Sequence, residues 1–237
     1  MSRVLVVPDI NLNMKKLLTG LERARELHAD TIVLMGNYFY YAGAPKSAKA
    51  MMDVWDELRR VMRNDTRIVP LIGEDDLNYM LLGFKTEKYH EKFAKQLGGK
   101  LLADQRFVPC LAIDGVLYSH AGVTTTWLRN YKIMLENELR FRLGKNGGAG
   151  LIESNIFKLR SWDLFLDEES CMRSEMSNLI TYAPPNVKQV VGHTKFQNVE
   201  NFGKLWFANS RVWNEFVFVK DGDPCILTDL ESKKWNI

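Results

Sequence analysis

The chain has 237 residues, 46% of them hydrophobic and 26% charged, with a formal net charge of +3. This composition is that of a folded globular protein and excludes a disordered or fibrous chain. The length suits one large domain with a substantial core, and no stretch has the composition of an interdomain linker, so we expect a single domain over residues 1–237.

The basic residues do not form the one-sided patch that nucleic-acid binding requires. Residues 56–67 and 129–145 each carry several basic side chains, but acidic side chains are interleaved with them. Solvated helix faces explain such a mixture better than a phosphate-binding surface. We therefore expect no nucleic-acid partner.

The apolar runs and the cysteines indicate the cellular compartment. The first apolar run, Arg3–Val7, is too short for a signal peptide, and no run approaches the roughly 20 residues that span a bilayer. Cys110, Cys171 and Cys225 stand far apart without metal-binding spacing, which favours free thiols in a reducing compartment. We expect a cytoplasmic protein with no membrane association.

The first half of the chain alternates strand and helix patterns. Apolar runs predict strands over residues 3–7, 31–35 and 67–72, and apolar residues at helical spacing predict helices over 12–28 and 46–63. This order is typical of a parallel sheet, in which ligands gather at the carboxyl ends of the strands.

The second half is richer in strands. Apolar runs over 107–113 and 116–118 flank Asp114-Gly115, which predicts a type I′ hairpin. A helix is expected over 124–143 and a cap-like insertion at about 145–185. Four further strands are expected over 187–191, 205–208, 215–219 and 225–227. The pattern predicts an α/β protein in which two mixed β-sheets pack as a sandwich flanked by helices.

Five short polar segments come directly after apolar runs. They are Asp9-Ile10-Asn11, Gly36-Asn37, Gly73-Glu74-Asp75, His120-Ala121-Gly122 and Gly192-His193-Thr194. Because each follows a predicted strand, we expect their side chains to meet at one rim of the sheets.

These segments resemble the motifs of the calcineurin-like metallophosphoesterases. The family pattern is Gly-Asp-x-His, Gly-Asp-x-x-Asp-Arg, Gly-Asn-His-Glu, a His-Ala-Gly segment and Gly-His-Thr, and the five segments occur in that order over nearly the whole chain. Within the family, the chain is most similar to the compact serine/threonine phosphoprotein phosphatases of bacteriophages and bacteria. The resemblance implies the four-layer metallophosphatase-type fold.

The resemblance also implies the ligands of two metal ions. The matching positions are Asp9, Asn11, Asn37, Glu74, His120 and His193. In the family, an Asp at position 37 bridges two ions about 3.5 to 4 Å apart, and its charge offsets their repulsion. Asn37 supplies only a neutral amide, and Asn11 replaces a His ligand. The two-metal site is therefore expected to be degraded.

A single ion is a separate expectation. Glu74, His120 and His193 form a set of two histidines and one carboxylate, which suits one Zn, Mn or Fe ion. Asp9 is then a fourth ligand or a hydrogen-bond partner of a ligand. The alternative is that the two histidines are relics hydrogen-bonded to the backbone of a filled pocket.

The catalytic positions depart further from the family. Asp75 stands where the resemblance places a proton-donating His, and an ordinary carboxyl group is ionised at neutral pH. Tyr41 replaces the Arg that binds phosphate, and Tyr40 replaces the Asp beside it. Packing explains the aromatic residues 38–41 better than stacking on a ligand.

Two functions remain after this comparison. The first is a pseudo-phosphatase that keeps the scaffold and binds a protein partner or a phosphorylated ligand. The alternative is an active phosphoesterase with a rearranged site of at most one ion, in which Asp9 or Asp75 activates water. Asn11 and Asn37 are replacements that an experimenter makes to silence a metal site, but Glu74 and Asp75 are not, which favours natural divergence.

Overall fold

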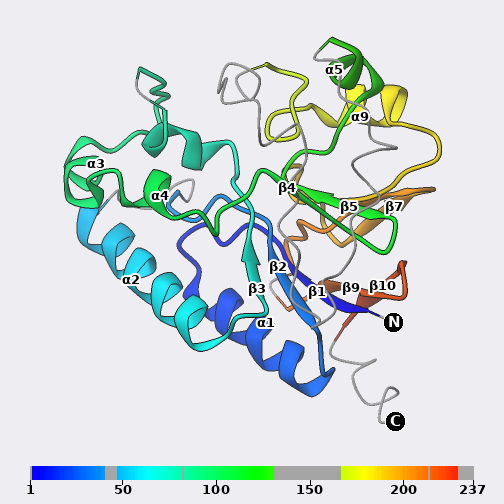
Figure 1. Cartoon of the computed structure of the whole chain (residues 1–237), viewed down its shortest axis with the longest axis horizontal. Helices are drawn as coiled ribbons and strands as arrows, with labels where there is room; N and C mark the ends of the chain where they lie inside the picture. The colour runs from blue at the N-terminus through cyan, green and yellow to red at the C-terminus, as the bar shows by residue number, and fades with distance from the viewer. Residues whose placement is uncertain (1, 41–46, 82, 131–166, 213, 229–237) are drawn as a thin grey trace.

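The computed structural model describes residues 2–40, 47–81, 83–130, 167–212 and 214–228 (Figure 1). In this part of the chain, ten strands form two five-stranded mixed sheets. The α/β class and the two mixed sheets predicted from the sequence are confirmed. Tyr41, residues 131–143 of the predicted helix and residues 145–166 of the predicted insertion lie outside the described residues.

The first sheet has the strand order β10-β9-β1-β2-β3. The strands β1, β2 and β3 run parallel, whereas β9 and β10 are antiparallel to their neighbours. Two helices, α1 and α2, connect the parallel strands. The bounds are β1 Arg3–Val7, α1 Met14–Glu26, β2 Thr31–Leu34, α2 Ala48–Asn64, β3 Ile68–Pro70, β9 Phe216–Lys220 and β10 Asp223–Leu227.

The second sheet has the order β4-β5-β6-β8-β7. The pairs β5–β6 and β6–β8 are parallel, and the two edge strands are antiparallel to their neighbours. The bounds are β4 Cys110–Ile113, β5 Val116–Ser119, β6 Lys188–Val191, β7 Glu200–Phe202 and β8 Leu205–Phe207. The remaining elements are the 3₁₀ helix η1 Asp75–Tyr79 and the helices α3 Glu91–Leu97, α4 Lys100–Ala103, α5 Thr125–Asn130 and α9 Met176–Tyr182.

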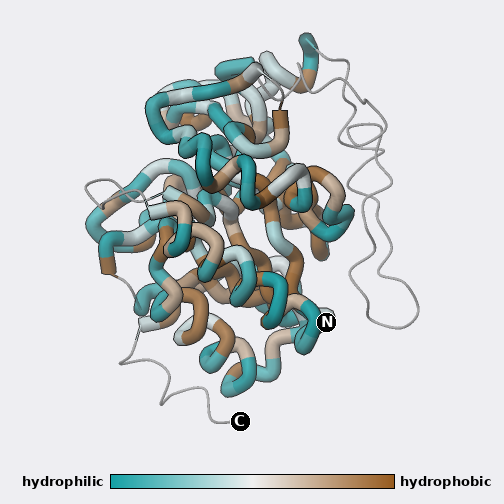
Figure 2. Tube along the Cα trace, turned by 90° about the vertical axis from the view of Figure 1, so that its left-hand side faces the viewer, coloured by the Kyte–Doolittle hydropathy of each residue, from teal (hydrophilic) through white to brown (hydrophobic). Residues whose placement is uncertain are grey.

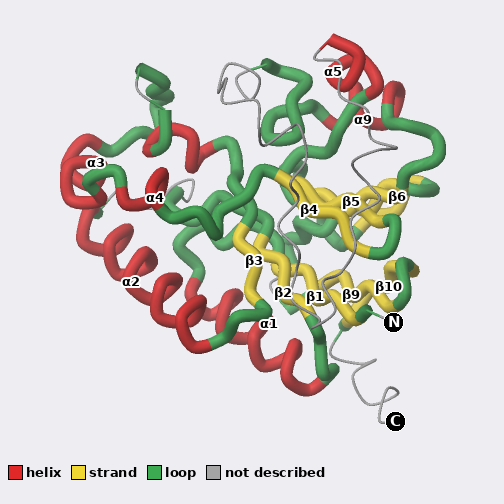
Figure 3. Tube along the Cα trace, in the orientation of Figure 1, coloured by secondary structure: helices red, strands yellow, loops and turns green. Residues whose placement is uncertain are grey.

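Alternation along β1 explains how the layers pack. Val4 and Val6 belong to a buried cluster that joins the two sheets, whereas Leu5 and Val7 belong to the cluster formed with α1 and α2. Leu179 of α9 packs on the outer face of the second sheet. The order of layers is therefore helices, sheet, sheet, helices (Figure 3), and hydrophobic and hydrophilic residues alternate along the helices (Figure 2).

The two sheets are also connected through the backbone. Leu71, just after β3, forms a parallel bridge with Val108, just before β4. The segment around Val108 therefore extends the first sheet beside Leu71 and then enters β4 of the second sheet.

The turn between β4 and β5 confirms the predicted hairpin. Asp114 and Gly115 have φ values of 47° and 76°, as a type I′ turn requires. No helix in the described part of the chain has the length and the apolar run needed to cross a membrane.

Helix α1 approaches β1 closely at Gly20. A Cβ atom added there would lie 2.6 Å from Val7 Cγ2, so the helix can pack at this distance only with a glycine. We expect Gly20→Ala to lower the free energy of unfolding by about 1–3 kcal/mol through overpacking, measured by urea denaturation.

Leu18→Ala on the same helix is the control. Leu18 is 42% exposed, so its replacement should change the free energy of unfolding by less than about 0.5 kcal/mol. A gain of stability in Gly20→Ala, as helix propensity alone would give, would contradict the close packing of α1 on β1.

Candidate functional site

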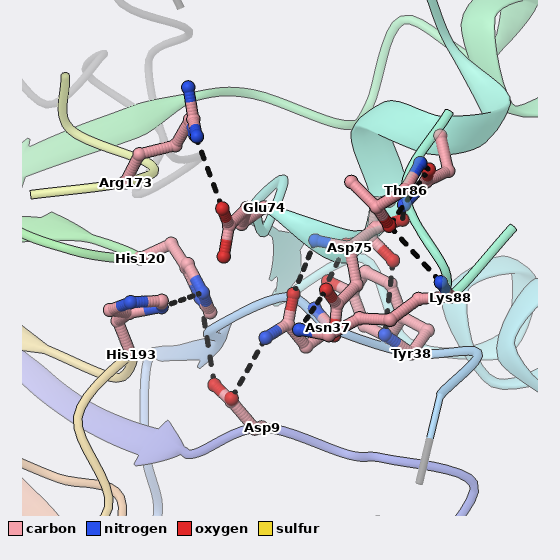
Figure 4. A network of polar contacts seen from close by, with 12 residues as sticks. Asp9, Asn37, Tyr38, Glu74, Asp75, Thr86, Lys88, His120, Arg173 and His193 are labelled. Carbon is pink, nitrogen blue, oxygen red and sulfur yellow. Dashed lines mark hydrogen bonds and ion pairs between the residues drawn. The ribbon is translucent and has the colours of Figure 1, made fainter. Parts of the chain in front are cut away.

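Loops from both sheets meet at one rim of the sandwich. Each loop leaves the carboxyl end of a parallel strand, β1, β2 and β3 in the first sheet and β5 and β6 in the second. Six of the residues predicted from the sequence come together there: Asp9, Asn37, Glu74, Asp75, His120 and His193 (Figure 4).

Asn37 links the loops after β1 and β3. Its Nδ2 donates to Asp9 Oδ2 at 3.1 Å, and its Oδ1 accepts from the backbone N–H of Asp75 at 2.9 Å. The amide orientation follows from chemistry, because reversing it would point an NH₂ group at the Asp75 N–H. Asn37 therefore presents a nitrogen, and not an oxygen, to Asp9.

Asp76 organises the same loops. Its Oδ2 accepts from the backbone N–H groups of Asn37 and Gly73, both at 2.9 Å, and its Oδ1 accepts from that of Tyr38 at 3.1 Å. Burial raises the pKa of Asp76 to about 7, although these backbone hydrogen bonds oppose the shift. No role was predicted for Asp76 from the sequence. Its only signal there was its place as the third acidic residue in a row, directly after Glu74 and Asp75.

Asp9 is 3% exposed. Its Oδ1 lies 3.5 Å from His120 Nδ1 and has no hydrogen-bond partner among the described residues. Burial raises the pKa of Asp9, and the positive charge of Lys16 opposes this shift. Lys16 on α1 is itself buried and donates from Nζ to the backbone oxygen of Asp9 at 3.1 Å. Burial lowers the pKa of Lys16 to about 8, while Asp9 opposes the shift.

The two histidines contact each other directly. His120 Nδ1 lies 2.7 Å from the backbone oxygen of Met35, which can only accept, so Nδ1 carries the proton. Burial lowers the pKa of His120 to about 3, so the ring is neutral. His120 Nε2 therefore accepts from His193 Nδ1 at 3.2 Å. This arrangement includes the backbone hydrogen bond of the relic interpretation.

Glu74 and Asp75 each have a cationic partner from the protein. Arg173 Nε lies 3.1 Å from Glu74 Oε1, and Lys88 Nζ lies 2.7 Å from Asp75 Oδ1. Burial raises the pKa of Asp75, and Lys88 opposes the shift. Lys16, Lys88 and Arg173 were not predicted from the sequence, because a single basic residue in a loop or helix carries no local signal of its partner.

The Asn11 side chain bonds to the backbone of the loop after β2. With its amide nitrogen toward the loop after β2, it donates to the backbone oxygens of Tyr40 at 2.9 Å and Asn37 at 3.2 Å. Tyr38 and Phe39 in that loop are 0% and 2% exposed, which confirms the packing interpretation for these two aromatic residues.

The residues present do not fit the two-metal pair of the family. The bridging position holds the Asn37 amide, whose nitrogen already donates to Asp9. The one-ion set does not fit as arranged either, because Arg173 pairs with Glu74 and the two histidines bond to each other. In the described ranges, no group of three His, Cys, Asp or Glu side chains is placed to hold a metal ion.

Comparison with known proteins supports the fold alone. No protein-family model and no curated protein sequence matches the chain. Its structure is similar to that of the hypothetical protein PH1004 from Pyrococcus horikoshii OT3, with a TM-score of 0.50, 10% identity and coverage of 99% of this chain and 92% of that one. For the protein TT1561 of Thermus thermophilus, the TM-score is 0.48 at 11% identity, with 96% and 98% covered.

Replacing Asp76 tests the organisation of the loops. Asp76→Asn turns one acceptor into a donor that faces backbone N–H groups, which should lower the free energy of unfolding by about 1–3 kcal/mol. The folded pKa of about 7 lies above the unfolded value of about 4. The contribution of Asp76 to stability is therefore full below pH 4 and decreases as the pH rises to 7.

The stability loss in Asp76→Asn should thus be larger at pH 4 than at pH 7 in urea denaturation. Asp56→Asn, an exposed position on α2, is the matched control. A loss that is the same at both pH values would show that Asp76 has an ordinary pKa in the folded protein.

Proposed function

We propose that this chain is a cytoplasmic protein of the metallophosphatase-type fold whose two-metal site is degraded, and that it acts by binding rather than by hydrolysis. The four layers and the order of the five loop motifs support the fold.

The orientation of Asn37 carries the proposal. A bridging carboxylate offers negative charge to two cations at once and so offsets part of their repulsion. Asn37 is neutral, and it directs its N–H toward Asp9, which matches another ligand of the first ion in the family. Two divalent ions at this position would face a donor where they need an acceptor.

Protein cations support the same conclusion. Clustered buried carboxylates require positive partners, and metal ions fill this role in an active phosphatase. Here Arg173 pairs with Glu74, Lys88 pairs with Asp75, and Lys16 bonds to the backbone of Asp9. These side chains stabilise the acidic loops without metal.

The pairing also bears on the choice of ligand. Arg173 and Lys88 are 23% and 28% exposed at the rim, but each is already bound to a carboxylate. A phosphate group would have to compete with Glu74 and Asp75 for them and would be repelled by both. Of the two kinds of partner expected from the sequence, a protein partner is therefore favoured over a phosphorylated ligand.

An active phosphoesterase with one ion is the second candidate. Two atoms favour it: Asp9 Oδ1 is buried without a hydrogen-bond partner in the described part of the chain, and His120 Nε2 bears a lone pair held in place by the Met35 contact. A carboxylate oxygen and a neutral imidazole nitrogen suit Mn, Zn or Fe. Binding of an ion would require His193 to leave His120 and Glu74 to leave Arg173.

Metal content and activity separate the two candidates. After incubation with Mn²⁺ or Zn²⁺ and desalting, we expect less than one ion per chain by elemental mass spectrometry and no hydrolysis of p-nitrophenyl phosphate. The variant His120→Ala with His193→Ala is the control. One ion in the native protein that is lost in this variant would overturn the proposal in favour of the one-ion enzyme, and two ions would restore ordinary two-metal chemistry.

Restoring two family residues gives a second test. Asn37→Asp with Asp75→His should create no phosphatase activity toward p-nitrophenyl phosphate in Mn²⁺. The Glu74–Arg173 pair remains in this variant, and the phosphate-binding Arg is still replaced by Tyr41. Asp75→His alone is the control. Activity in the double variant alone would show that the rest of the pocket still supports catalysis.

A further inference from the structure

A second recess lies away from the loop rim. It is an open surface depression of about 650 Å³ between α2 and the segment that contains α4 and the turn after it. None of the six site residues that meet at the rim lines it.

Trp55 forms the inner wall of this pocket and is 1% exposed. Its ring stacks on Phe107 at 6.1 Å between centroids. Its indole Nε1 is buried and has no hydrogen-bond partner among the residues that the structure describes. Tryptophan can only donate at this atom, and an unmade buried hydrogen bond is costly, so an acceptor from outside the protein would be stabilising.

Arg59 provides a second donor of the same kind. Its guanidinium lies over the Trp55 ring, 5.7 Å from the centroid. Its Nε is also buried without a hydrogen-bond partner in the described ranges. The next residue, Arg60, instead bonds to Glu57 at 2.6 and 2.5 Å on the surface of α2. Arg60 therefore uses its guanidinium in an ion pair, whereas the Nε of Arg59, at the pocket, remains able to donate a hydrogen bond.

The charges lining the pocket favour an anion. Its described lining contains Arg59, Lys100 and Arg106 but one carboxylate, Asp104. Arg106 binds Asp104 with two hydrogen bonds, of 2.8 and 2.5 Å. Because Asp104 is already held by Arg106, the positive charges of Arg59 and Lys100 dominate the pocket.

We infer that this pocket binds the oxyanion group of a small ligand, a phosphate or a carboxylate. Arg59 and Lys100 supply charge, and Trp55 Nε1 and Arg59 Nε donate to its oxygens. The planar guanidinium fits both kinds of group, whose oxygens accept parallel hydrogen bonds. Both nitrogens are shielded from solvent in the structure, so binding requires the side chains that line the pocket to rearrange.

The indole N–H signal of Trp55 provides a direct test. The ¹⁵N-labelled full chain has six tryptophans, and Trp55→Phe identifies the signal; sequential NMR assignment does so if that variant does not fold. The protein is titrated with inorganic phosphate and, separately, with acetate, at an ionic strength held constant with sodium chloride. We expect a saturable shift of the Trp55 signal.

Matched variants show whether Arg59 is responsible. Arg59→Gln should raise the apparent Kd by about tenfold or more, as the loss of one charge-assisted contact predicts, whereas Arg60→Gln should leave it unchanged. A stronger response to phosphate assigns the site to phosphate-bearing ligands, and a stronger response to acetate assigns it to carboxylates.

Three results would overturn the inference: a Trp55 signal that does not move, an equal shift with chloride alone, or an unchanged Kd in Arg59→Gln. None of them concerns metal content or hydrolysis, so the pocket can fail while the proposed pseudo-phosphatase stands. Equally, the proposed pseudo-phosphatase can fail while the oxyanion pocket stands.

Discussion

The carboxylate of Asp76 holds the loops after β2 and β3 together, and the rest of the site depends on this constraint. It accepts hydrogen bonds from three backbone N–H groups of the two loops. The loops are so close that a Cβ at Gly36 would lie 2.4 Å from the nitrogen of Gly73. With the backbone fixed in this way, the Asn37 side chain falls between Asp9 and Asp75. The backbone therefore fixes the position of residue 37, and the type of its side chain determines whether an amide or a carboxylate lies between Asp9 and Asp75.

Charge balance at the rim follows from the same geometry. Several acidic side chains are held at the ends of adjacent strands, and burial makes their isolated charges unfavourable. Three basic side chains from separate elements or loops contact these residues: Lys88, Arg173 and Lys16.

Local patterns in the sequence were sufficient for most of the fold. Strand β1 matches its predicted bounds, and the hairpin at Asp114 was predicted from two residues. The exposed strand β7, Glu200–Phe202, and the short helix α4, Lys100–Ala103, were missed, because three or four residues show too little periodicity. The candidate site was located from the strand ends, but its ion pairs were not, since Arg173 and Glu74 are 99 residues apart in the chain.

The bridge between Leu71 and Val108 has a mechanical consequence. It continues one sheet directly into the segment that begins the next, so the two sheets cannot slide past each other without breaking backbone hydrogen bonds. The rim contains residues from both sheets, with Asp9 on one side and His120 on the other. A partner bound across the rim would contact residues of both sheets. It would therefore restrain the motion of one sheet relative to the other and stabilise the core between them.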